Sequence, residues 1–171
     1  MKKFILIFLC VTSLFAASAL EFGSLSADFV QTIKSGGKDI VYNGRFYATT
    51  KEAFWEYDSP ARKRIYFSDD RVVIIEDELE QAIISRLENV PNLTSILRNA
   101  KRISDKLYKA SYDDVDYLIS IDERGVVSMI DYKDKLDNKV KITLSNVIKN
   151  GKINPEIFIP HIPQGYDIIS R

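Results

Sequence analysis

Apolar and polar residues alternate with a period of two along most of this chain. The clearest run is residues 139–145, where Val140, Ile142 and Leu144 alternate with lysine, threonine and serine. Residues 42–47 and 114–121 repeat the pattern. Successive side chains of a strand point to opposite faces of its sheet, so the alternation predicts strands with one buried face.

Short turn signals separate these runs at even intervals. They lie at residues 35–38 (SGGK), 68–71 (SDDR), 76–78 (EDE), 112–114 (YDD), 122–125 (DERG) and 149–151 (KNG). A parallel α/β fold would need helices between its strands, and the intervals leave no room for them. The pattern therefore favours an antiparallel meander, sandwich or barrel.

One segment has helical spacing instead. Leu93, Ile96, Leu97 and Ala100 follow Pro91 and Asn92 at the intervals of an amphipathic helix. A single helix within a sheet protein has to lay its apolar side on the sheet or plug an open end of it.

The first 19 residues are typical of a secretory signal peptide. Two lysines precede an apolar run and small residues, so we expect cleavage before Leu20 and an exported, soluble product. No later stretch approaches the roughly 18 apolar residues of a membrane-spanning helix. Residues 20–171 are expected to form one domain, which retains no cysteine because Cys10 lies in the signal.

The composition of residues 20–171 excludes several functions. Their 22 basic and 24 acidic residues give a formal net charge of −2, with no basic footprint for nucleic acid or a membrane surface. All nine tyrosines, Trp55 and six of the nine phenylalanines lie in this part. Such aromatic content suits a β-rich fold with a wide interior.

Residues with catalytic potential are few. His161 is the only histidine, so a zinc site or a Cys/His pair is not expected. Acidic clusters at residues 69–70, 76–80 and 113–116 fall at predicted turns, although paired carboxylates at such turns would serve a glycosidase. The GGK at residues 36–38 lacks the spacing of a phosphate-binding loop. We therefore expect no enzyme, no cofactor and no metal site.

Five segments carry a set of motifs in order. They read SLSADFVQTIKSGG (24–37), NGRFYATTKEAFWEYDSP (43–60), RIYFSDDRVVIIEDELEQA (64–82), VPNLTSILRN (90–99) and FIPHIPQGYDII (158–169). Together they resemble the LolA family of periplasmic lipoprotein carriers, whose opening strand has the pattern F-x-A-x-F-x-Q. Each motif alone is weak, but five in register behind a signal peptide are fairly specific.

The resemblance implies a mainly β (α+β) fold. The expected architecture is an incomplete antiparallel β-barrel of about eleven strands around an apolar cavity, lidded by one or more short helices. The implied function is a periplasmic chaperone, here expected to be monomeric, that binds the acyl chains of lipoproteins. An inner-membrane ABC-type complex would release the cargo, and a LolB-like outer-membrane acceptor would take it in species that have one.

The resemblance and the alternation together suggest three groups of site residues. The cavity wall is predicted to comprise Phe29, Tyr42, Phe46, Trp55, Tyr57, Ile65, Phe67, Ile142 and Leu144. The lid is predicted to comprise Leu93, Ile96, Leu97 and Lys51, and contacts with partner proteins are assigned to Phe54, Arg62 and Arg64.

The chain departs from the family pattern at three points. The family's Arg-Pro pair falls on Thr50 and Lys51, and the resemblance assigns the arginine's role to Lys51, which lacks the planar fork of a guanidinium. Phe54 and Trp55 are adjacent, so a regular strand would place Trp55 with Ala53 and Tyr57 and turn Phe54 to the other face. After cleavage before Leu20, too few residues precede Leu25 for the family's N-terminal helix, so either Leu20 and Phe22 close that part of a reduced lid or cleavage occurs earlier in the chain.

Three other functions stay open at this point. A LolA-like half-barrel can act as a lipid or envelope-stress sensor, usually with a second domain. An outer-membrane acceptor of the LolB type would need a lipobox, which this sequence lacks. A hydrolase using the acidic turns is the remaining alternative.

Overall fold

The computed structural model describes residues 20–68, 70–86 and 93–170. The predicted signal peptide (1–19) and the helix-start residues Pro91 and Asn92 lie outside these ranges. Within the described ranges, no helix has both the length and the apolar character that crossing a bilayer requires.

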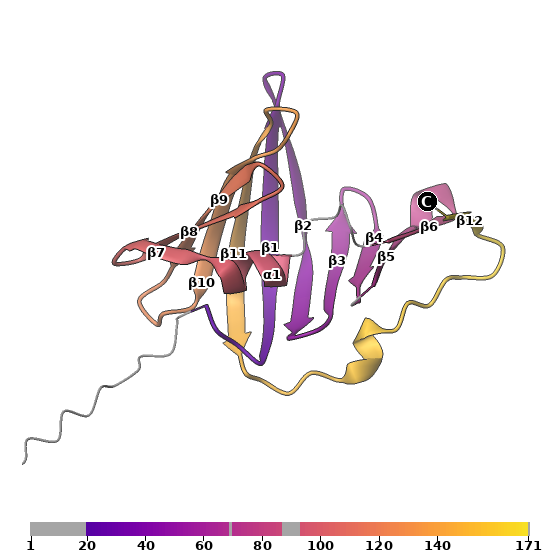
Figure 1. Ribbon diagram of the computed structural model, residues 1–171. Coiled ribbons are helices and arrows are strands. Elements are labelled where there is room, and N and C mark those ends of the chain that lie inside the picture. The colour runs from indigo at the N-terminus through magenta and orange to yellow at the C-terminus, as the bar shows by residue number, and fades with distance from the viewer. Residues whose placement is uncertain (1–19, 69, 87–92, 171) are drawn as a thin grey trace, which may run out of the picture.

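Strands dominate the fold, as the alternation predicts (Figure 1). In chain order they are β1 (Ser24–Ser35), β2 (Lys38–Thr49), β3 (Ala53–Ser59), β4 (Lys63–Phe67), β5 (Arg71–Glu76), β6 (Gln81–Arg86), β7 (Lys101–Ser104), β8 (Leu107–Tyr112), β9 (Val115–Ile121), β10 (Val127–Lys133), β11 (Lys139–Lys149) and β12 (Asp167–Ser170). The described residues also form three short helical segments, namely η1 (Asp77–Leu79), α1 (Leu93–Asn99) and η3 (Pro155–Phe158).

All twelve strands form one sheet in the order β12-β6-β5-β4-β3-β2-β1-β11-β10-β9-β8-β7. The ends of this order do not pair with each other, so the predicted incomplete barrel is confirmed as an open sheet that curves around α1 (Figure 1). One pairing departs from the antiparallel expectation, because β12 runs parallel to β6. Before β12, the chain crosses the convex face of the sheet. It then enters the sheet running in the same direction as β6.

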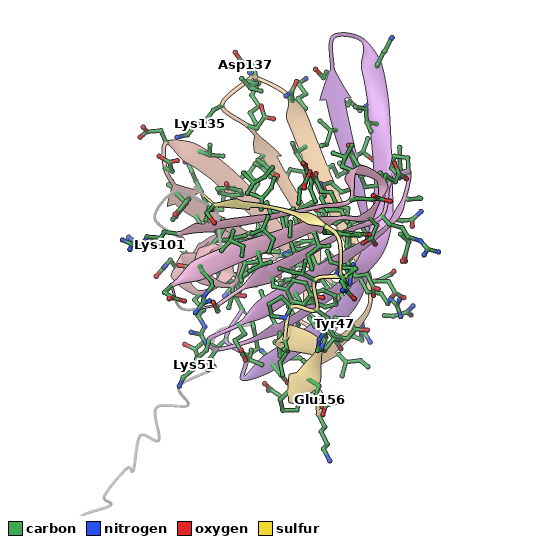
Figure 2. The ribbon with its side chains drawn as sticks, turned by 90° about the vertical axis from the view of Figure 1, so that its right-hand side faces the viewer. Tyr47, Lys51, Lys101, Lys135, Asp137 and Glu156 are labelled. Carbon is green, nitrogen blue, oxygen red and sulfur yellow. The ribbon has the colours of Figure 1, made fainter. Side chains whose placement is uncertain are left out.

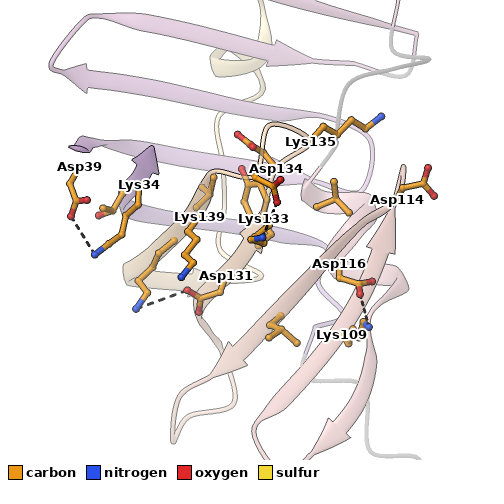
Figure 3. Close-up of a pocket in the computed structure, with 17 residues that line it drawn as sticks. Lys34, Asp39, Lys109, Asp114, Asp116, Asp131, Lys133, Asp134, Lys135 and Lys139 are labelled. Atoms are coloured by element: carbon orange, nitrogen blue, oxygen red, sulfur yellow. Dashed lines mark hydrogen bonds and ion pairs between the residues drawn. The ribbon is translucent and has the colours of Figure 1, made fainter. Parts of the chain in front are cut away.

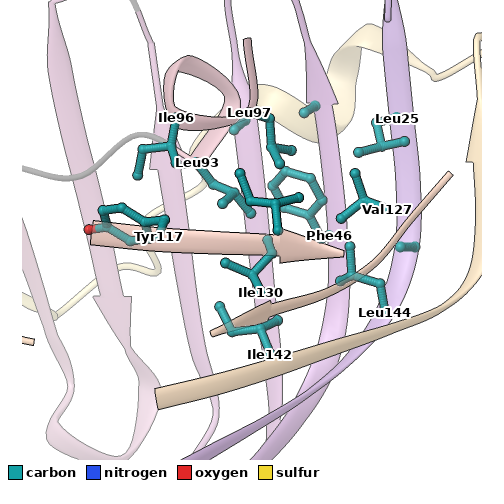
Figure 4. Packing of buried hydrophobic residues seen from close by; sticks show 14 of the residues in the cluster. Leu25, Phe46, Leu93, Ile96, Leu97, Tyr117, Val127, Ile130, Ile142 and Leu144 are labelled. Atoms are coloured by element: carbon teal, nitrogen blue, oxygen red, sulfur yellow. The ribbon is translucent and has the colours of Figure 1, made fainter. Parts of the chain in front are cut away.

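The concave face of the sheet carries the main hydrophobic core. Phe29 of β1, Phe46 of β2, Ile119 of β9 and Ile130 of β10 are almost completely buried there. Figure 4 shows Phe46 and Ile130 within this cluster, below α1. Leu20 and Phe22 belong to the same cluster, so the short N-terminal segment closes part of the core without a helix.

Helix α1 has only seven residues and depends on packing for its stability. Leu93, Ile96 and Leu97 are buried against the concave face, and Arg98 and Asn99 are exposed. The predicted amphipathic helix is therefore present, with its apolar side on the sheet.

The convex face carries a second, smaller cluster. Phe54, Tyr66 and Ile75 are buried there under Phe158 of η3. In Figure 2, Tyr47 and Glu156 lie on the same side of the molecule, where the C-terminal segment crosses the sheet. The C-terminal segment thus covers apolar surface that would otherwise be exposed on the outside of the half-barrel.

Candidate functional site

A cavity of about 170 Å³ lies between α1 and the concave face of the sheet. Strands β1, β3, β4, β9, β10 and β11 and helix α1 supply its wall. The lining residues are Gln31, Trp55, Tyr57, Ile65, Phe67, Leu93, Ile96, Tyr117, Tyr132 and Ile142. Most of this surface is aliphatic or aromatic, so the cavity suits an apolar ligand.

Trp55 lines this cavity, and its ring packs against two aromatic core residues, Phe29 and Phe46. Its ring lies 4.9 Å from that of Phe29, edge to face, and 4.4 Å from that of Phe46. Ala53 and Tyr57 share its face of β3, whereas Phe54 belongs to the convex cluster. The predicted separation of Phe54 from Trp55 is therefore confirmed.

The structure brings seven of the predicted cavity and lid residues together around this space: Trp55, Tyr57, Ile65, Phe67, Ile142, Leu93 and Ile96. The other predicted residues lie elsewhere. Phe29, Phe46, Leu144 and Leu97 are buried in the core without lining the cavity. Tyr42 packs beside Tyr57, with 5.7 Å between ring centroids.

One end of the cavity is polar. The hydroxyl of Tyr57 donates a hydrogen bond to Oε1 of Gln31 over 3.0 Å. Burial, with smaller contributions from Tyr132 and Tyr42, raises the pKa of Tyr57, and burial also raises the pKa of Tyr132 to about 12. Both phenols are therefore neutral at physiological pH, and each carries an O–H group that can donate a hydrogen bond.

A glycine opposite Tyr57 allows β2 and β3 to approach each other at this point. Gly44 pairs with Tyr57, and a Cβ atom built on Gly44 would lie 1.8 Å from the carbonyl oxygen of Glu56. No side chain fits at that distance, so glycine is required here for the strand pairing that positions Tyr57.

Helix α1 is tied to the β2–β3 connection by Arg98. The guanidinium of Arg98 donates to the backbone carbonyl of Thr50 over 3.0 Å. Lys51, predicted to hold the lid, is exposed at the periphery of the molecule (Figure 2), and its backbone N–H donates a hydrogen bond to Oγ1 of Thr49. Among the described residues, the predicted contact from Lys51 to the lid is therefore replaced by a contact in the other direction. Arg98 of helix α1 bonds to Thr50, the residue before Lys51.

The three residues assigned to partner contacts lie on the convex face or its edge. Phe54 is covered by the C-terminal segment of its own chain. Arg64 forms a 2.6 Å ion pair with Asp77, whose carboxylate also accepts from the hydroxyl of Tyr166. Arg62 is exposed and Arg64 is partly exposed, whereas a partner would reach Phe54 only if the C-terminal segment moved.

A larger hollow of about 1100 Å³ lies among the hairpin ends and the outer side of β8 to β11 (Figure 3). Lysine and aspartate residues dominate its lining, and Lys34–Asp39, Lys109–Asp116 and Lys133–Asp137 form ion pairs. An alkyl chain placed there would strip water from charged groups. Despite its smaller volume, the cavity under α1 is therefore the better site for an apolar ligand.

The described residues offer no other obvious chemistry. No group of three or more histidine, cysteine or acidic side chains gathers among them in a way that could hold a metal ion. His161 is exposed in the C-terminal segment, and its backbone carbonyl is 3.5 Å from the guanidinium of Arg64.

Three lining residues escaped the prediction. Gln31, Tyr117 and Tyr132 are polar or amphipathic, whereas a cavity for acyl chains is expected to have an apolar wall. The alternation itself carried the signal, because Gln31 shares a face of β1 with Phe29 and Tyr117 shares a face of β9 with Ile119.

Comparisons with known proteins agree with these features. Residues 21–114 match the family model described as "Outer membrane lipoprotein carrier protein LolA". A Campylobacter jejuni protein named outer-membrane lipoprotein carrier protein is 40% identical over 168 residues, which cover 98% of each chain. A Wolinella succinogenes protein of the same name is 42% identical over 143 residues, covering 82% of this chain and 81% of the relative.

A solved structure also shares the fold. It is an uncharacterized conserved protein from Thermus thermophilus, with a TM-score of 0.55 at 10% identity, and the match covers 90% of this chain and 94% of that one. At this identity the likeness concerns the fold alone. The family model and the near full-length relatives decide the classification: the chain belongs to the LolA family of outer-membrane lipoprotein carrier proteins.

Proposed function

We propose that this protein carries acylated lipoproteins across the periplasm, with their acyl chains held in the cavity under α1. The observation that carries the proposal is the apolar cavity closed by a seven-residue helix, in a chain of the lipoprotein carrier family. The protein acts as a container for its cargo rather than as an enzyme.

The cavity widens when cargo enters. Its 170 Å³ is well below the roughly 300–1,000 Å³ of pockets that enclose drug-sized ligands. Leu93 and Ile96 of α1 form part of its wall, and Arg98 provides the polar tie between α1 and Thr50. The movement that makes room is a displacement of α1 away from the concave face.

The energies of lid opening and cargo binding favour this movement. Exposing Leu93, Ile96 and Leu97 costs about 1.5–3 kcal/mol for each side chain, or about 5–9 kcal/mol together. Removing one 16-carbon acyl chain from water yields about 12 kcal/mol at about 0.8 kcal/mol per methylene. A single chain is therefore enough to offset the opening of the helix.

The same energies imply that cargo passes directly between proteins. Release of one acyl chain into water would cost about 12 kcal/mol, and closure of α1 would return about 5–9 kcal/mol of this, so release into water stays unfavourable by about 3–7 kcal/mol for each chain. The donor we propose is an inner-membrane ABC-type complex, and the acceptor is an outer-membrane protein of the LolB type where one is present.

The proposal is tested by native mass spectrometry of the full chain, expressed with its signal and purified from the periplasm under mild conditions. We expect the protein to carry triacylated lipoprotein. Ile65→Trp should lose this cargo because the larger ring fills the cavity, while its stability stays close to that of the wild type. Consistently empty wild-type protein, or protein that holds only phospholipid, would overturn the proposal.

A matched control separates cavity filling from the presence of an extra indole. Val41 lies half-exposed on β2 and does not line the cavity, so Val41→Trp should retain the cargo. Equal loss of cargo in both variants would also contradict the assignment of the cavity.

A further inference from the structure

Gln31 is a buried polar residue in the wall of an otherwise largely apolar cavity. Its side chain is only 9% exposed, and its Oε1 accepts the hydrogen bond from Tyr57. The amide nitrogen of Gln31 carries two N–H donors, and among the described residues it is not one of the fully buried atoms that lack a partner, so these donors are open to the space of the cavity. The amide therefore offers N–H donors at the surface of the cavity.

The strand register gives the cavity an apolar end and a polar end. Along the β3–β4 ladder, Phe67 pairs with Ala53, Ile65 pairs with Trp55, and Lys63 pairs with Tyr57. At the polar end, the amine of Lys63 lies 4.7 Å from the centre of the Tyr57 ring. Gln31 faces Tyr42 across the neighbouring strand, so the amide belongs to this polar end.

Like the cavity, an acyl group has one apolar end and one polar end. Its methylenes are apolar, whereas the ester or amide that links it to its carrier ends in a carbonyl oxygen, which accepts hydrogen bonds but donates none. A methylene packed against the Gln31 amide would exclude water and leave the N–H donors unpaired, which is unfavourable. A carbonyl at the same position would satisfy them.

We propose that Gln31 donates a hydrogen bond to a carbonyl oxygen of the bound acyl group, and so sets the direction in which the chain enters. The linkage then lies between Gln31, Tyr57 and Tyr132, and the hydrocarbon extends towards Trp55 and Phe67. This inference rests on the proposed carrier function. It adds that the protein recognises the carbonyl group of the acyl linkage by a hydrogen bond.

The test compares two lipopeptides of equal chain length. In one, the cysteine carries a diacylglyceryl group with ester-linked chains, and in the other the same chains are linked as ethers, which lack the carbonyl oxygens. Their dissociation constants are measured for the wild type, for Gln31→Met, and for Thr32→Val. Methionine keeps the length of glutamine without its donors, and Thr32 lies on the opposite face of β1, at the outer hollow.

We expect the wild type to bind the ester form about 3- to 10-fold more tightly than the ether form, the range for one hydrogen bond. Gln31→Met should reduce this ratio to about 1, by the loss of that same bond. Thr32→Val should keep the wild-type ratio. The ratio is taken within each variant, so a general loss of affinity in Gln31→Met leaves the comparison valid.

The outcomes separate this inference from the carrier function. Equal binding of both lipopeptides by the wild type, or an unchanged ratio in Gln31→Met, would overturn the role of Gln31 and leave the carrier function standing. A wild type that binds neither lipopeptide would overturn both.

Discussion

Trp55 and Phe54 illustrate how neighbouring residues acquire different tasks. Trp55 joins Phe29 and Phe46 at the cavity, and Phe54 stacks on Tyr66 in the convex cluster, with 4.6 Å between ring centroids. A strand turns successive side chains to opposite faces, so a single aromatic dipeptide serves both sides of the sheet. Trp55 therefore contributes to the wall of the cavity under α1, and Phe54 to the hydrophobic cluster behind it.

The buried tyrosines of the cavity should make stability depend on pH at the alkaline end. Tyr132 has a pKa of about 12 in the folded protein, against roughly 10 in the unfolded chain. Its neutral form is favoured by folding, so this contribution is complete below about pH 10 and is lost as the pH rises through about 12. The complete loss is on the order of 3 kcal/mol, at about 1.4 kcal/mol per unit of pKa.

Urea unfolding of the wild type and of Tyr132→Phe at about pH 8 and about pH 11.5 checks this expectation. Phenylalanine does not ionise, so the difference in free energy of unfolding should move in favour of the variant at the higher pH. A difference that stays constant over this range would show that Tyr132 does not titrate with a raised pKa.

At the scale of the elements, α1 is the part of the described cavity wall best suited to move. It is short, it lies on the concave face without pairing into the sheet, and Arg98 contributes a polar tie at its exposed side. By contrast, every strand of the wall is hydrogen-bonded to two neighbours in the sheet. A lid drawn from the weakly held elements is what ligand exchange requires.

Replacing Arg98 by glutamine should loosen this lid. The loss of one hydrogen bond to Thr50 predicts a rise of about 3- to 10-fold in the hydrogen exchange rate of the α1 amides. The release of a bound acyl lipopeptide should become faster as well. Both effects are measured on the same protein, by exchange with mass spectrometry and by dissociation kinetics.

Arg102→Gln provides the matched control, because within the part of the chain that the structure describes Arg102 bonds only to Ser104 and Asp105 of its own hairpin. It should leave exchange in α1 unchanged. Equal exchange rates for α1 in both variants would show that Arg98 does not hold the lid.

At the scale of the whole molecule, the sequence predicted the architecture better than the details of the cavity. Alternation fixes the face of each side chain, which placed Trp55, Tyr57 and Ile142 correctly on the concave side. It does not give the depth along a strand, so Phe29 and Leu144 were assigned to the cavity although they pack beside it. Depth depends on the register between strands, which is a long-range property.

The C-terminal segment shows the same limit. Its coverage of Phe54 and the parallel pairing of β12 with β6 join residues far apart in the chain, and no local pattern predicts either contact. The bond from Arg98 to Thr50 has no local sequence signal either, because it depends on how α1 lies on the sheet.

The central claim is that acyl chains occupy the concave cavity under α1. Photo-cross-linking tests it most directly, using a triacylated lipopeptide with a diazirine in one acyl chain and the full-length exported protein, followed by peptide mapping. We predict labels on cavity residues such as Trp55, Phe67 and Leu93, with a strong decrease in Ile65→Trp. Labels confined to the charged outer hollow or to the convex face around Phe54 would contradict it.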